Sequence, residues 1–124
     1  MILADTSVLL RALQNREPYA AEAAALTSRG ELAAHPLVYG ELLIGDPGGR
    51  VAFLDAYARL PAAPLAEHDA VVSLVRSRHL HGRGLHWIDA HLLASALAAD
   101  LRLWTADAPL AAAARDLGVA WPAA

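Results

Sequence analysis

Short apolar segments of strand length alternate with longer helical patterns along most of the chain. Buried strands are predicted at Ile2–Ala4, Glu31–Ala34, Leu101–Thr105 and Val119–Trp121, with a further short strand near Pro64–Ala66. Helices are predicted at Val8–Gln14, Pro18–Arg29, from Pro36 onward, Arg50–Arg59, Glu67–Leu80, Trp87–Ala99 and Pro109–Leu117. Strands that alternate with helices indicate an α/β fold built on a parallel sheet.

Length and composition indicate one folded domain over residues 1–124. The chain has 124 residues, of which 56% are hydrophobic, and this is enough for a single core. No apolar run approaches the roughly 20 residues of a membrane span, and the N-terminal MILADTS lacks the basic region of a signal peptide. Cysteine is absent, which excludes disulfides and thiolate metal sites. We therefore expect a cytoplasmic protein that does not bind membranes.

Four carboxylates interrupt or follow apolar segments: Asp5 in ILADTS, Glu41 in VYGELLIG, Asp89 in HWIDAHLLAS and Asp107 in RLWTAD. Burial of an unpaired carboxylate is costly, so four of them in or beside core segments require a compensating cation. Magnesium or manganese prefers such oxygen ligands and keeps bound waters. One of these waters can serve as the nucleophile in phosphodiester cleavage.

The predicted topology permits these four acids to converge. Asp5 and Asp107 directly follow strands, and open α/β sheets bind their ligands at the carboxyl ends of the strands. Glu41 and Asp89 must reach that edge from helices, where helical spacing places both among core-facing residues. Structural roles compete with this interpretation, because Asp5 and Asp107 also suit helix N-caps and Glu41 could pair with an arginine. Asp89 has the least polar surroundings.

Other polar residues lie near the predicted edge. The hydroxyls of Thr6, Ser7 and Thr105 could hold a carboxylate or a metal-bound water, with helix capping and strand propensity as the competing explanations. Arg11 and Arg83 are candidates for phosphate contacts with a nucleic acid, although exposed arginines are common.

Histidines and tryptophans also cluster in the second half of the chain. The spacing of the histidines matches no closed zinc site, so we expect surface or packing roles for His79, His81, His86 and His91. We expect Trp87 and Trp104, which flank two of the acids, to pack in the core rather than to stack on bases.

The segments ILADTSVLL, GELLIG, WIDAHLLASAL and LWTAD together resemble the PIN-domain ribonucleases, in particular the VapC-type toxins of bacterial toxin–antitoxin pairs. The resemblance covers nearly the whole chain. It implies a three-layer sandwich in which helices flank a central five-stranded parallel sheet. It places Asp5, Glu41, Asp89 and Asp107 in the acidic site positions, as catalytic residues and metal ligands.

The resemblance also implies an activity and partners. In that family the acids hold Mg²⁺ or Mn²⁺, and an activated water attacks a phosphodiester bond of RNA. We expect Asp5, Glu41 and Asp89 to be the principal ligands, and Asp107 to act through a water or a second metal. The implied substrate is structured RNA, such as a transfer RNA or a ribosomal RNA loop. The implied partners are a VapB-type antitoxin, with which the toxin forms a hetero-oligomer, and a second copy of the chain in a homodimer.

Two other classes of α/β protein also carry aspartates at strand ends. These are the receiver domains and the haloacid-dehalogenase-like phosphatases. Both require a lysine, and all ten basic residues of this chain are arginines, so both classes are excluded.

The net charge of −3 is weak evidence against an RNA substrate, because a bound divalent ion offsets part of it. The remaining alternative is a catalytically inactive module of the same fold, whose acidic groove binds a basic protein partner. A purely structural protein would show no metal dependence.

Overall fold

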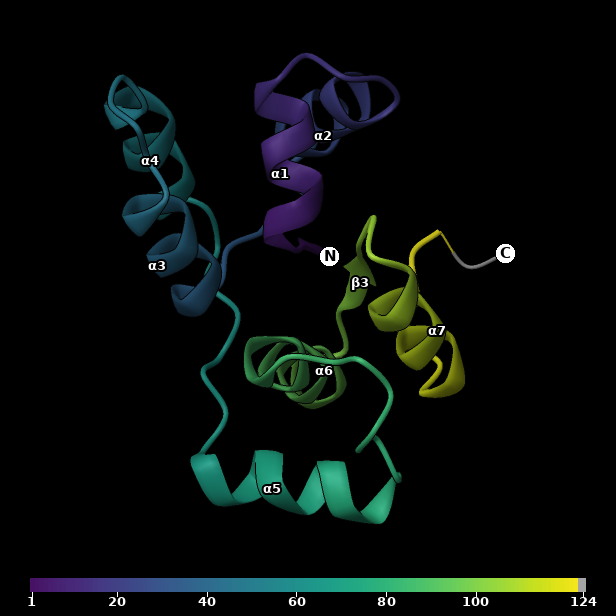
Figure 1. Ribbon diagram of the computed structural model, residues 1–124. Helices are drawn as coiled ribbons and strands as arrows, with labels where there is room; N and C mark the ends of the chain where they lie inside the picture. The colour runs from purple at the N-terminus through teal and green to yellow at the C-terminus, as the bar shows by residue number, and fades with distance from the viewer. Residues whose placement is uncertain (123–124) are drawn as a thin grey trace.

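The computed structural model describes residues 1–122, and in this part of the chain helices enclose a three-stranded parallel sheet (Figure 1). The strands are β1 (Ile2–Ala4), β2 (Leu32–Ala33) and β3 (Arg102–Trp104), in the order β2-β1-β3. In the central strand, Leu3 is paired with Ala33 on one side and with Leu103 on the other. The predicted parallel α/β class is confirmed, and the strands are fewer than the five predicted.

One missing strand lies at the β2 edge. Within residues 1–122 its place is taken by a single parallel bridge between Ala34 and Ala62. The Ala34 N–H donates to the carbonyl of Pro61 at 2.8 Å, and the Ala63 N–H donates to the carbonyl of Ala34 at 2.7 Å. Pro61 and Pro36 have no N–H, and the next bridge on either side would need these two donors, so regular pairing cannot extend along this edge. The strand expected near Pro64–Ala66 is therefore replaced by a bridge a few residues earlier.

The other missing strand lies at the β3 edge, where Leu103 forms a single bridge with Ala120. The Leu103 N–H donates to the carbonyl of Val119 at 2.7 Å, and the Trp121 N–H donates to the carbonyl of Leu103 at 2.9 Å. The strand predicted at 119–121 thus has the predicted position and direction, but it forms only one bridge among the described residues.

The helices agree with the predicted ones within a few residues at each end. They are α1 (Thr6–Leu13), α2 (Tyr19–Ser28), α3 (Pro36–Ile44), α4 (Val51–Ala58), α5 (His68–Ser77), α6 (Trp87–Ala99) and α7 (Ala108–Asp116). Within residues 1–122, no helix has the length and apolarity required to cross a membrane.

The helices form layers around the strands. In Figure 1, α1 and α2 lie above β3, whereas α6 lies below it and separates it from α5. Helix α6 is apolar on almost every side, because it is covered both by the sheet and by α5. Its buried residues join the core around the fully buried Leu3 and Val8. Burial on two sides makes α6 a rigid support for the carboxylate at its N-terminal end.

Candidate active site at the carboxyl ends of the strands

Asp5 follows the central strand and is the buried centre of the site. Its side chain is only 5% exposed. Its N–H donates to the carbonyl of Trp104 at 3.0 Å, which extends the pairing of β1 and β3 to the residue where the chain turns into α1. Its carboxylate caps that helix by accepting the Val8 N–H at 3.1 Å. The capping role and the predicted position at the sheet edge are therefore both found.

Two hydroxyls orient the Asp5 carboxylate. Ser7 Oγ donates to Oδ1 at 2.6 Å, and Thr105 Oγ1 donates to Oδ2 at 2.5 Å. Each hydroxyl also accepts a backbone N–H from the segment after β3, Ser7 from Ala106 at 3.0 Å and Thr105 from Asp107 at 3.0 Å. A hydroxyl has one proton, so both protons are committed to Asp5. Within residues 1–122, Oδ2 accepts only the Thr105 hydroxyl, which leaves it capacity for a further ligand.

Glu41 reaches the same edge from α3, the helix that directly follows β2. It is half-buried, and its Oε1 accepts a hydrogen bond of 2.7 Å from Thr6 Oγ1. Thr6 is the residue after Asp5, so this bond links the second carboxylate to the turn that carries the first. The three hydroxyls singled out from the sequence each contact one of the four acids.

Asp89 and Asp107 complete the group of acids from two further helices. Asp89 lies in the first turn of α6 and accepts the His86 N–H at 2.9 Å. Asp107 is exposed and caps α7 by accepting the Leu110 N–H at 3.3 Å. Burial raises the pKa of Asp89, and the negative charges of Asp107 and Asp5 raise it further, against the opposing effects of the His86 N–H and side chain. Carboxylates from α6, α7 and the end of β1 thus act on one another electrostatically.

The donor set matches a hard divalent cation in chemistry and charge. The ion pairs among the described residues are Arg29 with Glu31 and Arg83 with Asp116, so none of the four acids is paired with a basic side chain there. Carboxylate oxygens that repel one another and lack a cationic partner are suitable ligands for Mg²⁺ or Mn²⁺. In residues 1–122, however, no three His, Cys, Asp or Glu side chains are already gathered closely enough to hold a metal ion. The donors fit the ion, and some side-chain movement would accompany its binding.

Both predicted phosphate-contacting arginines have partners within the chain. Arg11 donates to the carbonyl of Ser7 at 2.9 Å, and its guanidinium lies 5.7 Å from the centre of the Tyr19 ring. Arg83 forms an ion pair of 2.7 Å with Asp116 of α7. Contact between these arginines and RNA remains a prediction, and it would compete with these internal contacts.

A buried polar chain beneath the site was not recognised in the sequence. His35 and Ser95 are 1% and 0% exposed, and His35 Nε2 lies 2.9 Å from Ser95 Oγ, which donates to the carbonyl of Pro64 at 2.6 Å. His35 Nδ1 accepts the Leu37 N–H at 3.1 Å, so Nε2 carries the proton and donates to Ser95. This chain connects α3 with α6, and the only sequence signal for it was the pair His35-Pro36 before a helix.

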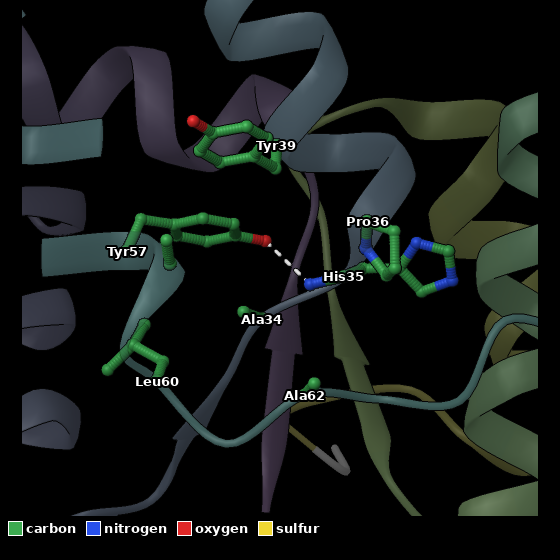
Figure 2. Close-up of a pocket in the computed structure, with 8 residues that line it drawn as sticks. Ala34, His35, Pro36, Tyr39, Tyr57, Leu60 and Ala62 are labelled. Atoms are coloured by element: carbon green, nitrogen blue, oxygen red, sulfur yellow. Dashed lines mark hydrogen bonds between the residues drawn. The ribbon is translucent and has the colours of Figure 1, made fainter. Parts of the chain in front are cut away.

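The same histidine lies beside an apolar hollow of about 250 Å³ between α3 and α4 (Figure 2). Figure 2 shows the Tyr57 hydroxyl directed at the His35 N–H, which donates to it at 2.9 Å, with the Tyr39 ring stacked above the Tyr57 ring. Burial raises the pKa of Tyr57 to about 12. The hollow contains none of the four acids, so it is not the place where a metal would be held.

The two tryptophans that flank the acids differ in their surroundings. Trp104 is 6% exposed and packs against Tyr19 and Trp121, as expected for a core residue. Trp87 is 44% exposed. The expectation that Trp87 packs in the core is therefore wrong: its ring lies at the exposed N-terminal end of α6, against only the rings of His68 and His91 among the aromatic contacts described.

The chain is similar to known proteins along nearly its whole length. The PIN domain profile matches residues 2–116. The chain is 44% identical over 121 residues to Ribonuclease VapC32 of Mycobacterium tuberculosis, in both strain CDC 1551 / Oshkosh and strain ATCC 25618 / H37Rv, covering 97% of this chain and 95% of each relative. The crystal structure of PAE2754 from Pyrobaculum aerophilum has a similar fold, with a TM-score of 0.58 and 20% identity over 94% of each chain.

Proposed function

Because this chain belongs to the PIN-domain family of VapC-type ribonucleases, we propose that it is a metal-dependent endoribonuclease and the toxin of a toxin–antitoxin pair. It hydrolyses phosphodiester bonds in structured RNA, such as a transfer RNA or a ribosomal RNA loop. The observation that carries the proposal is the electrostatic coupling of Asp89 to Asp107 and Asp5, with no basic side chain paired to any of these acids among the described residues.

The cofactor in this proposal is Mg²⁺ or Mn²⁺, held by Asp5, Glu41 and Asp89, with Asp107 acting through a water or a second ion. A bound divalent ion lowers the pKa of its water and neutralises charge that develops on the phosphate. The Asp5 carboxylate accepts three hydrogen bonds, and Oδ2 accepts only one of them. Oδ2 can therefore bind a metal ion while Oδ1 continues to cap α1. An oxygen-only donor set favours these ions over zinc, which is more often held by nitrogen and sulfur.

The chain's own residues supply orientation in this scheme. Ser7 and Thr105 hold the Asp5 carboxylate in one rotamer, and Thr6 holds Glu41. Because Asp5 is buried, water does not compete for the hydrogen bonds that orient its carboxylate. Fixed acids of this kind require little rearrangement as charge develops at the scissile phosphate, and preorganisation of this kind contributes to catalysis.

The proposed protein partners are a VapB-type antitoxin and a second copy of the chain, giving a homodimer within a toxin–antitoxin hetero-oligomer. An acidic edge suits a basic antitoxin segment. Apolar side chains exposed around the turn from α3 to α4 support an additional buried interface: Leu43 is 52% exposed, Ile44 89% and Val51 67%.

Cleavage of total bacterial RNA by the purified, antitoxin-free protein tests this function. We expect discrete fragments with Mg²⁺ or Mn²⁺, and none with EDTA or with Asp89→Asn. Asp55→Asn is the matched control, because it removes one carboxylate from an exposed position on α4. Equal cleavage by the parent, by Asp89→Asn and in EDTA would contradict the proposal. Antitoxin binding without any cleavage would favour the inactive binding module.

A further inference from the structure

A small hollow of about 150 Å³ lies between the end of α5, the loop after it and the first turn of α6, the helix that carries Asp89. Its apolar floor includes Leu80, Leu85 and Ala90, and its rim carries the side chains of His81, His86 and Trp87. An apolar floor with aromatic and imidazole groups at the rim suits a flat ring that also carries hydrogen-bonding edges.

His86 connects the hollow with the proposed catalytic site. This residue lines the hollow, and its backbone N–H is bound by the Asp89 carboxylate at 2.9 Å. The loop also reaches the other side of the acidic edge, because Gly84 lies against Pro109, two residues after Asp107. A group held in the hollow would therefore belong to a substrate whose neighbouring part is at the acids.

The walls of the hollow are held in place. Arg83 ties the loop to α7 through its 2.7 Å ion pair with Asp116. The Trp87 ring lies against the rings of His68 and His91, each with its ring centre 5.3 Å from that of Trp87. Trp87 nevertheless leaves 44% of its surface exposed. An exposed indole on a fixed support loses little conformational freedom when a ring stacks on it.

We propose that this hollow, which we name the Trp87 subsite and define by His81, His86 and Trp87, binds one unpaired nucleobase of the RNA next to the cleaved phosphodiester. The proposal rests on the function proposed above. Sequence-specific recognition of RNA uses splayed bases that stack on aromatic side chains and form hydrogen bonds along their edges. Trp87 offers the stacking surface, and the two histidines offer ring nitrogens that can donate or accept. The subsite would contribute to the choice of cleavage position.

Two readouts on the same proteins test the subsite. One is cleavage of a short single-stranded RNA library with randomised positions, with the fragment ends sequenced. The other is binding of the same fluorescently labelled library, measured by anisotropy in EDTA so that cleavage is suppressed. The variants are Trp87→Ala and Trp87→Phe, with Leu97→Ala as the control that removes an exposed apolar side chain further along α6. Circular dichroism establishes that each variant is folded.

We expect Trp87→Ala to bind the library about tenfold or more weakly and to lose the base preference at one position beside the cut. Trp87→Phe should retain the preference, because phenylalanine still stacks, and Leu97→Ala should match the parent. If the parent cleaves and Trp87→Ala has the parent's preference and affinity, the subsite is refuted and the ribonuclease function stands. If the parent binds in a Trp87-dependent way without cleaving, the subsite stands and the function is refuted. Absence of both binding and cleavage refutes both.

Discussion

The hydroxyl of Thr105 donates a 2.5 Å hydrogen bond to Oδ2 of Asp5, across 100 positions of the chain. Thr105 follows β3 and Asp5 follows β1, so this bond ties together the carboxyl ends of two paired parallel strands. It holds in place the carboxylate that we propose as the central metal ligand.

Thr105→Val tests the role of this bond. Valine keeps the shape but leaves Asp5 Oδ2 and the Asp107 N–H without the hydroxyl. We expect metal affinity and the rate of RNA cleavage to fall about 10- to 100-fold, as is usual when a partner of a metal ligand is removed. The free energy of unfolding should fall by about 1–3 kcal/mol. Thr27→Val on the exposed side of α2 is the control, and equal losses in both variants would contradict this role.

Asp89→Asn is expected to separate stability from activity in metal-free protein. The folded state raises the pKa of Asp89, so it binds a proton more readily than the unfolded state does, and stability falls as pH rises through that range. At neutral pH in EDTA the variant should therefore resist urea as well as the parent or better, and this difference should narrow at acidic pH. Cleavage should be lost. Lower stability than the parent at neutral pH would contradict the electrostatic coupling.

Because of the buried His35, we expect the free energy of unfolding to fall at acidic pH. Burial, with a smaller contribution from the neighbouring His91, lowers the pKa of His35 from 6.5 to about 4. Between these values the unfolded state binds a proton that the folded state does not, so stability falls as pH falls through this window. The contribution reaches about 3 kcal/mol at the acidic end. Urea unfolding in EDTA should show a shallower pH dependence for His35→Gln than for the parent, and identical slopes would refute this assignment.

Ser95→Ala interrupts the chain from His35 to Pro64. The buried Nε2 proton of His35 loses its acceptor, and we expect a loss of about 1–3 kcal/mol in the free energy of unfolding. Ser77→Ala, at an exposed position near the end of α5, should have little effect. A similar small effect of both substitutions would mean that water replaces the Ser95 hydroxyl.

The central elements and the edge on which the acids lie could be predicted from the sequence. Apolar segments followed at once by Asp5 and by Thr105 indicate parallel strands that end together, and the structure pairs them. Helical spacing indicated that Asp89 faces inward, and it is partly buried beside Asp5 and Asp107. These predictions succeed because they depend on local pattern and on a general property of parallel sheets.

The remaining features depend on contacts between distant segments. The outer strands are limited to single bridges among the described residues, which residue counts in apolar segments do not reveal. The partner of His35 is 60 positions away, and the partner of Arg83 is 33 positions away. Trp87 lies at the exposed N-terminal end of α6, so its apolar character alone predicted the wrong environment.

Binding of Mn²⁺ by isothermal titration calorimetry tests the central claim most directly, because it needs no knowledge of the RNA target. The parent and the Asp55→Asn control should bind the ion equally, whereas Asp5→Asn should bind at least about tenfold more weakly. Asparagine still caps α1, so the loss would reflect the missing charge rather than a disturbed helix. Equal binding by Asp5→Asn and the parent, or no binding by any of the three proteins, would contradict the account.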